Sequence, residues 1–165
     1  MRTAFILSFL ANVALSLLSL AVLPARVAIH FGPGGAADGW ASGSASTAIM
    51  LGVQILLFLS LYLSPRLLAR VPARWINLPN RDYWLAPQRR TQALSRLSDH
   101  LWRYGTALFL FLLVAGLLTL QANLSDPVRL DERLFLGALL VFLVYTAWWI
   151  GTLLRAFRAP SGSAH

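Results

Sequence analysis

The chain has 165 residues, of which 58% are hydrophobic and only 12% are charged, and its mean hydropathy is +0.65. Soluble domains contain about 25% charged residues, so this composition excludes a typical water-soluble globule. The formal charge is +8, and the absence of cysteine excludes disulfides, thiolate metal sites and cysteine nucleophiles.

Four apolar segments, at residues 3–23, 47–64, 105–122 and 134–154, contain no charged side chain. An 18-residue helix rises roughly 27 Å, which is close to the thickness of the hydrocarbon core of a bilayer. The first segment is longer than the hydrophobic region of a cleaved signal peptide, which is roughly 7–15 residues. We therefore predict an all-α integral membrane protein, with four transmembrane helices forming one domain over residues 1–158.

Residues 24–46 form the loop between the first two segments. In residues 27–31, larger apolar side chains alternate with alanine and histidine, which is the period of a β-strand. Residues 32–35 have the sequence Gly-Pro-Gly-Gly, which is typical of a turn. These patterns predict a short loop or β-hairpin that lies on the outer face of the membrane, with Trp40 near the lipid headgroups.

Residues 65–104, which we call the collar, form a basic and aromatic link between the second and third segments. Pro72, Pro79 and Pro87 prevent one continuous helix here, because each removes an amide donor and restricts the residue before it. Arginines and aromatic rings are typical of the headgroup layer. The collar residues that we expect there are Arg74, Trp75, Asn80, Arg81, Asp82, Tyr83, Trp84, Arg89 and Arg90.

One long helix is expected from about residue 87 to residue 122, with a proline at its first position. Apolar residues recur at helical spacing between 94 and 104, so this part is a cytoplasmic amphipathic extension of the third transmembrane helix. It would project roughly 25 Å beyond the hydrocarbon core. We expect Asp82 to form a structural ion pair with Arg89 or Arg90.

The arginines predict the orientation of the chain. If the N-terminus is cytoplasmic, three arginines lie outside and eleven lie inside: Arg2, the eight between residues 66 and 103, Arg155 and Arg158. Cytoplasmic loops carry the excess of basic residues, so both termini should be cytoplasmic. The positive charge thus follows one membrane face, which favours anionic lipid headgroups over nucleic acid as its partner. Residues 159–165 are small and polar and should be a disordered tail.

Polar residues inside the apolar segments are expected to face protein, because hydrocarbon offers them no hydrogen bonds. Ser8, Asn12 and Ser16 share one face of the first helix. Asn12 and Gln54 lie near the middle of antiparallel helices, so we predict that they face the interior of the bundle and contact each other. Tyr145, also in mid-span, is the alternative partner.

His30 and Asp38 are the best candidates for a chemical site, since an imidazole and a carboxylate in one loop could share a metal or a proton. Two ligands are fewer than the three that a catalytic zinc usually takes from protein. Further ligands would have to come from the second outer loop, from Asp126, Asp131 or Glu132. The simpler interpretation, which we favour, is that Asp38 caps a turn and His30 packs beside Trp40; no metal, cofactor or catalytic residue is then expected.

Two motifs carry a family resemblance: L-P-A-R-V-A-I-H-F with D-G-W-A-S in residues 23–42, and I-N-L-P-N-R-D-Y-W-L-A-P-Q-R-R at 76–90. With the apolar segment between them, they resemble the bacterial membrane family named domain of unknown function 1648, over about residues 10–95. This domain also forms the N-terminal part of proteins similar to the Sdp-type toxin immunity protein. The resemblance implies a bacterial inner-membrane protein without an established catalytic residue. It makes the outer loop the family signature, through Arg26, His30, Phe31, Asp38, Gly39 and Trp40.

These observations favour a non-enzymatic small membrane protein that binds, senses or assists something at the outer face of the membrane. Its partners would be anionic lipids on the cytoplasmic side and a protein or peptide ligand outside. A metal-assisted membrane hydrolase using His30 and Asp38 is the alternative. A transporter component is the third hypothesis, although no apolar segment contains the charged residue that ion pathways usually need.

Overall fold

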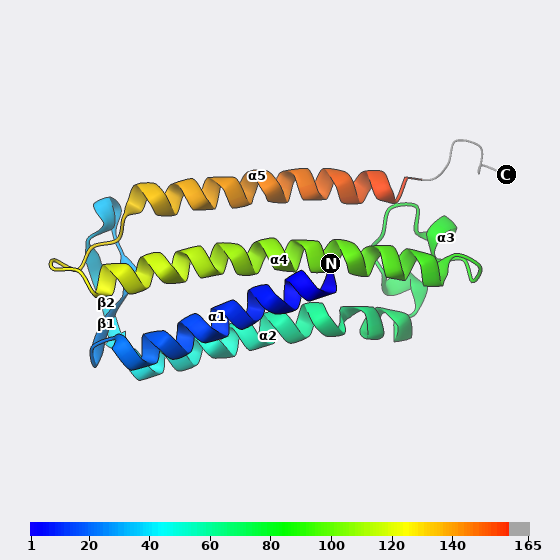
Figure 1. Cartoon of the computed structure of the whole chain (residues 1–165). Helices are drawn as coiled ribbons and strands as arrows, with labels where there is room; N and C mark the ends of the chain where they lie inside the picture. The colour runs from blue at the N-terminus through cyan, green and yellow to red at the C-terminus, as the bar shows by residue number, and fades with distance from the viewer. Residues whose placement is uncertain (159–165) are drawn as a thin grey trace.

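The computed structural model describes residues 1–158 and is mostly helical (Figure 1). Each of the four long helices is long and apolar enough to cross a membrane. Their bounds are Arg2–Val22 for α1, Gly43–Arg70 for α2, Arg90–Asn123 for α4 and Glu132–Ala156 for α5. The four predicted spans are thus confirmed as apolar helices. The predicted tail, residues 159–165, lies outside the described residues.

The loop between α1 and α2 is a two-stranded antiparallel hairpin, as the alternating pattern predicts. Its strands are β1, Arg26–Phe31, and β2, Ala37–Ser42, joined by a short 3₁₀ turn, η1, at Pro33–Gly35. Gly34 and Gly35 have φ angles of 76° and 78°, a region that glycine adopts without a steric penalty. The Ser42 hydroxyl then caps α2 by accepting a hydrogen bond from the amide of the third residue of the helix.

Helix α4 is the centre of the molecule and packs against all three other long helices. In Figure 1 it runs between α5 on one side and the pair α1 and α2 on the other. Helix α5 packs mainly on α4, and none of its residues is buried. The expected four-helix bundle is therefore better described as a three-helix core, α1, α2 and α4, with α5 lying along the outside of α4.

Aromatic side chains fill the core near the first turns of α1. The Phe5 ring stacks on Phe58 with centroids 5.1 Å apart and lies 5.7 Å from the ring of Phe109. Phe5 and Phe109 are completely buried. Gly105 lets α4 approach α1 here, because a Cβ at this position would lie 2.6 Å from the Phe5 ring.

The collar folds over the ends of α2, α4 and α5 at the end of the molecule opposite the hairpin (Figure 1). It contains a 3₁₀ turn, η2, at Ala73–Trp75 and one helical turn, α3, at Arg81–Trp84. Its small hydrophobic core consists of Ile76, Leu78, Trp84, Leu85, Ala93 and Phe157. The collar is therefore a packed structure and not only a ribbon along the membrane surface.

The predicted long helix is present, but it begins at Arg90 and not at Pro87. Residues 86–89 form a turn whose Ala86 carbonyl accepts hydrogen bonds from the amides of Arg89 and Arg90. Gly105 lies level with the first turns of α1, and the stretch of α4 before it rises roughly 22 Å. Helix α4 thus extends beyond the start of α1, while Arg90 at its own start bonds to carbonyls at the end of α2. The expected projection beyond the hydrocarbon core stays a prediction.

Candidate functional site

The hairpin is fixed to the end of α4 by one side chain. Asn123, the last residue of α4, accepts a hydrogen bond from the Ala28 amide through Oδ1 at 2.7 Å and donates to the Ala28 carbonyl through Nδ2 at 3.0 Å. Asn123 and Ala28 are buried, as is Val27 beside them. The carboxamide thus pairs with the Ala28 backbone as a neighbouring strand would, and it attaches β1 to the three-helix core.

The second outer loop, residues 124–131, holds the turn of the hairpin from the side. The Arg129 Nε donates to the Gly34 carbonyl at 2.8 Å, and the Leu130 amide donates to the Gly35 carbonyl at 2.8 Å. Glu132, at the start of α5, accepts a hydrogen bond from the Gly34 amide at 2.9 Å. The two outer loops therefore form one structure, although they are far apart in the sequence.

His30 and Asp38 are brought together across the hairpin, with Nδ1 and Oδ1 2.5 Å apart. Both side chains are more than half exposed, at 73% and 53%. Gly39 lies opposite His30, and a Cβ there would be 2.8 Å from the His30 Cβ. Asp38 thus pairs with His30 and does not cap a turn, which corrects the simpler sequence interpretation.

The other signature residues lie on the same hairpin but have different surroundings. The Arg26 guanidinium lies over the Trp40 ring, 5.5 Å from its centroid, while Trp40 remains 41% exposed. Phe31, at the end of β1, is half-buried and pairs with Ala37. His30 and Asp38 form one pair and Arg26 and Trp40 another.

His30 and Asp38 are not joined by a third metal ligand in the described part of the chain. Among residues 1–158, no group of three or more histidine, aspartate or glutamate side chains is placed to hold a metal ion. Asp131 caps α5 by accepting from the Leu134 amide at 3.0 Å, and Glu132 binds Gly34. Two of the three acids that could complete a metal site, Asp131 and Glu132, therefore have structural partners, and no acid of the second outer loop forms a set of three ligands with His30 and Asp38.

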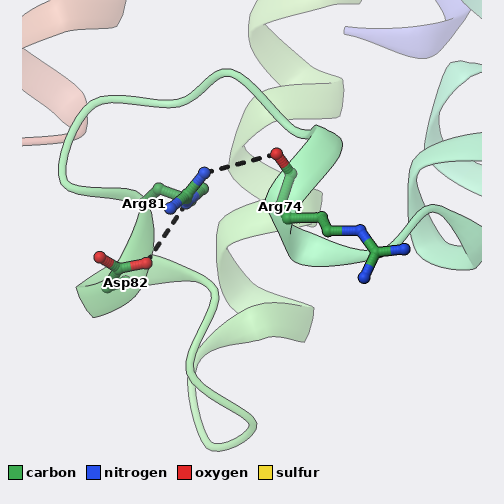
Figure 2. Close-up of polar contacts among 3 residues, drawn as sticks. All are labelled: Arg74, Arg81 and Asp82. Atoms are coloured by element: carbon green, nitrogen blue, oxygen red, sulfur yellow. Dashed lines mark hydrogen bonds and ion pairs between the residues drawn. The ribbon is translucent and has the colours of Figure 1, made fainter.

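The collar ion pair differs from the predicted one. Asp82 pairs with its neighbour Arg81, whose Nε lies 3.3 Å from the carboxylate, and not with Arg89 or Arg90. Figure 2 shows that Arg81 also reaches the backbone carbonyl of Arg74, with Nη1 at 3.4 Å, whereas the Arg74 guanidinium points away from it. Arg74 is exposed on the collar.

Arg89 and Arg90 have structural contacts within the collar. The Arg89 guanidinium stacks over the Tyr83 ring, 4.0 Å from its centroid. Arg90 donates to the Val71 carbonyl at 2.6 Å and to two nearby carbonyls at the end of α2. A cation at this position neutralises the partial negative charge of a helix C-terminus, so Arg90 caps α2.

The two collar tryptophans have opposite environments. Trp84 is only 7% exposed, packs edge-on against Phe157 and donates through Nε1 to the Phe157 carbonyl at 2.9 Å. Asn80 donates to the same carbonyl at 2.9 Å. Trp75, in contrast, is 72% exposed. Trp84 therefore belongs to the collar core, whereas Trp75 lies on the collar surface, and the predicted headgroup depth of both rings stays a prediction.

The polar residues of the core meet as the sequence argument expects. Gln54 Nε2 lies 3.4 Å from Asn12 Oδ1, and both residues are buried. The Asn12 Nδ2 group also donates to the carbonyls of Ser8, at 2.9 Å, and Phe109, at 2.7 Å, and the Ser16 hydroxyl lies 3.4 Å from Gln54 Oε1. Tyr145 is not part of this cluster, because α5 lies outside the core and the hydroxyl faces the Arg103 carbonyl at 3.4 Å.

Sequence reasoning did not identify Asn123, Arg129 or Glu132 as residues that hold the hairpin. The available signal was weak: a carboxamide at the end of an apolar segment, followed by a short loop with charges of both signs. Contacts between segments about 95 residues apart depend on helix packing that no local pattern specifies.

Comparison with known proteins gives a match over the first part of the chain. Residues 7–55 match the family model described as "Domain of unknown function (DUF1648)". The match includes α1 from residue 7, the hairpin and the part of α2 up to residue 55, whereas the collar motif at 76–90 lies beyond it. No curated protein and no solved structure matches the chain. Residues 7–55 are thus similar to this family of unknown function, which is the family that the sequence motifs resemble.

Proposed function

We propose that this protein is a non-enzymatic integral protein of the bacterial cytoplasmic membrane, and that its outer hairpin binds or senses a protein or peptide at the outer face. Four apolar helices and the family match support a membrane protein. The distribution of arginines, eleven near the collar end and three near the hairpin end, supports cytoplasmic termini and an external hairpin.

The observation that carries this proposal is the support given to the hairpin. Asn123 forms hydrogen bonds with β1, and Arg129 and Glu132 form hydrogen bonds with the turn of the hairpin. Nevertheless, the apolar side chains of Ile29 and Trp40 remain 54% and 41% exposed. A rigid surface that presents an aromatic and an aliphatic side chain is typical of a binding surface, because little conformational entropy is lost when a partner docks.

On the cytoplasmic side, we propose that the collar contacts anionic lipid headgroups through Arg74 and Trp75. Trp75 is largely exposed, and Arg74 is also exposed, with its guanidinium pointing away from Arg81 (Figure 2). A cation and an amphipathic ring side by side suit the headgroup layer. This contact would position the protein and needs no catalytic chemistry.

Site-specific photo-cross-linking in cells tests the outer-face proposal. A benzophenone amino acid would replace Ile29 on the hairpin and, as a matched control, Ile49 on the outer surface of α2, which is 68% exposed. We expect a discrete protein or peptide adduct at position 29 that is absent at position 49, because only the hairpin would contact a partner.

Two results would contradict the proposal. The first is the same pattern of adducts at both positions, which would indicate general contact with membrane components. The second is the absence of any discrete adduct at position 29 when the variant is stable and correctly inserted. Replacing Trp40 with alanine should weaken a genuine adduct at position 29, since both side chains are exposed on the hairpin that would contact the partner.

A further inference from the structure

A cavity of about 140 Å³ lies between α1, α2 and α4, in the half of the core nearest the hairpin. One water needs about 10–15 Å³ of such space, so the cavity is large enough for a small organic group. The polar residues that line it come from all three helices: Ser16, Ser19, Ser46, Thr47, Gln54 and Thr119. This site is separate from the hairpin surface and does not depend on the function proposed for it.

No lining residue of the cavity is charged. An ionic ligand would thus be left without a counter-ion in a region surrounded by apolar helices, which is energetically costly. The remaining lining residues are apolar and include Leu15, Met50 and Leu112. The lining therefore matches a molecule that is uncharged and has both a polar group and an apolar part.

Thr47 lines the cavity and is only 7% exposed, and its hydroxyl forms no hydrogen bond to another residue in the described part of the chain. Several other hydroxyls in the long helices bond to their own backbone. Thr106 and Thr146, for example, each donate at 2.8 Å to the carbonyl four residues earlier. The Thr47 hydroxyl is therefore available to donate a hydrogen bond to a molecule in the cavity.

Gln54 provides unused hydrogen-bonding capacity at the inner end of the cavity. It is 4% exposed, and its two hydrogen bonds, to Asn12 and from Ser16, are both 3.4 Å long. Typical bonds of this kind are about 2.9–3.0 Å long, so these two are weak. A carboxamide has two N–H donors and two lone pairs on its oxygen, so Gln54 retains a donor and an acceptor for a further partner.

We propose that this cavity binds the hydroxyl end of a neutral amphiphile, an uncharged molecule with an alcohol group on an alkyl chain. The alcohol donates to Gln54 Oε1 and accepts from the Thr47 hydroxyl, and the chain packs on the apolar lining. Met50, which lines the cavity, is 48% exposed, so the chain can leave toward the bilayer at this point. A membrane lipid with free hydroxyls and a free alkyl alcohol share this chemistry.

Photolabelling of the full chain in lipid nanodiscs tests the proposal. The probe is an octanol that carries a diazirine, and labelled residues are mapped by mass spectrometry. We expect adducts concentrated on cavity residues such as Met50 and Leu112, displaced by excess octanol and not by octane. Displacement by a monoacylglycerol in the bilayer would identify a lipid as the source, and displacement by octanol alone would identify a free alcohol.

Thr47→Val removes the hydroxyl and keeps the shape of the side chain. We expect cavity labelling to fall about fivefold, the effect of losing one hydrogen bond. Ser60→Ala is the matched control, because Ser60 lies on the same helix, is exposed and bonds only to its own backbone. It should leave the labelling unchanged.

Labelling spread evenly over lipid-facing residues such as Ile49, or equal competition by octane, would overturn the proposal. Unchanged labelling in Thr47→Val would do the same. If Thr47→Val does not fold, Thr119→Val, on α4 across the cavity, provides the second test. An increase in the thermal unfolding midpoint of the native protein on adding octanol, and not octane, is the independent readout, and its absence would also contradict binding.

Discussion

At the scale of single residues, Asn123 links the end of α4 to the hairpin. Its carboxamide satisfies both backbone groups of Ala28 in a buried position where water cannot replace it. Removing one partner of a buried hydrogen bond leaves the other group unsatisfied, which costs more than the bond itself contributes.

Asn123→Ala should therefore destabilise the hairpin by about 2 kcal/mol. Amide hydrogen exchange of β1 would measure the effect, and the Ala28 amide should exchange faster than in the native protein. Asn77→Ala is the control, because Asn77 is exposed in the collar and should leave β1 unchanged. Equal exchange rates in native protein and Asn123→Ala would show that the hairpin is held by its other contacts alone.

Gly105 is a second residue whose role is visible only in three dimensions. From the sequence it is a weak helix former inside a predicted helix, whereas in the structure it allows α4 to pack closely on α1. A Cβ would lie 2.6 Å from Phe5 and 2.9 Å from Leu61. The absence of a side chain is thus a packing requirement.

We expect Gly105→Ala to lower the unfolding free energy by about 1–3 kcal/mol, the range for overpacked cores. Gly137→Ala on α5 is the matched control, because no atom lies within 4 Å of a Cβ there. Thermal unfolding of the purified variants in the same detergent would measure the difference. A Gly105→Ala variant as stable as Gly137→Ala would show that Phe5 and Leu61 can move aside.

At the scale of elements, the helices and the hairpin could be predicted because their signals are local. Uncharged apolar segments specify the helices, and the alternation in residues 27–31 specifies β1. The collar could be predicted less well, because arginines and aromatic residues suit both a headgroup layer and a small packed core. Trp84 takes the second role and Trp75 is exposed, as the first role would require, and only their contacts distinguish them.

Tryptophan fluorescence of single-tryptophan variants should separate these two environments. Trp84 is enclosed by the collar core, so a variant that keeps only Trp84 should resist quenching by aqueous iodide and by lipid-attached quenchers. A variant that keeps only Trp75 should be quenched by one of the two, and which one reports the depth of the collar. Strong quenching of Trp84 by either agent would mean that the collar core is open.

At the scale of the whole molecule, composition predicted the class of protein but not the packing of its helices. All four apolar segments are similar in hydropathy, yet α1, α2 and α4 form the core while α5 has no buried residue. The difference comes from the polar and small residues that the first three helices contribute, Asn12, Gln54 and Gly105, which hydrogen-bond or approach closely.

Reporter fusions test the orientation of the molecule. Fusions after Gly43 and after Asn123 should report an external position, and a fusion after Arg90 a cytoplasmic one, because the membrane face that carries more arginines is expected to be cytoplasmic. A cytoplasmic signal from the fusion after Gly43 would reverse the orientation and place the hairpin inside the cell.

Helix α5, which packs mainly on α4, is nevertheless fastened at both ends. Glu132 at its beginning binds the turn of the hairpin, and the Phe157 carbonyl just beyond its end binds Trp84 and Asn80 of the collar. An α-helix resists stretching along its axis, since its length is fixed by a continuous ladder of hydrogen bonds. Helix α5 is therefore a rigid mechanical connection between the two ends of the molecule. A displacement of the hairpin turn along the helix axis would be transmitted directly to the collar.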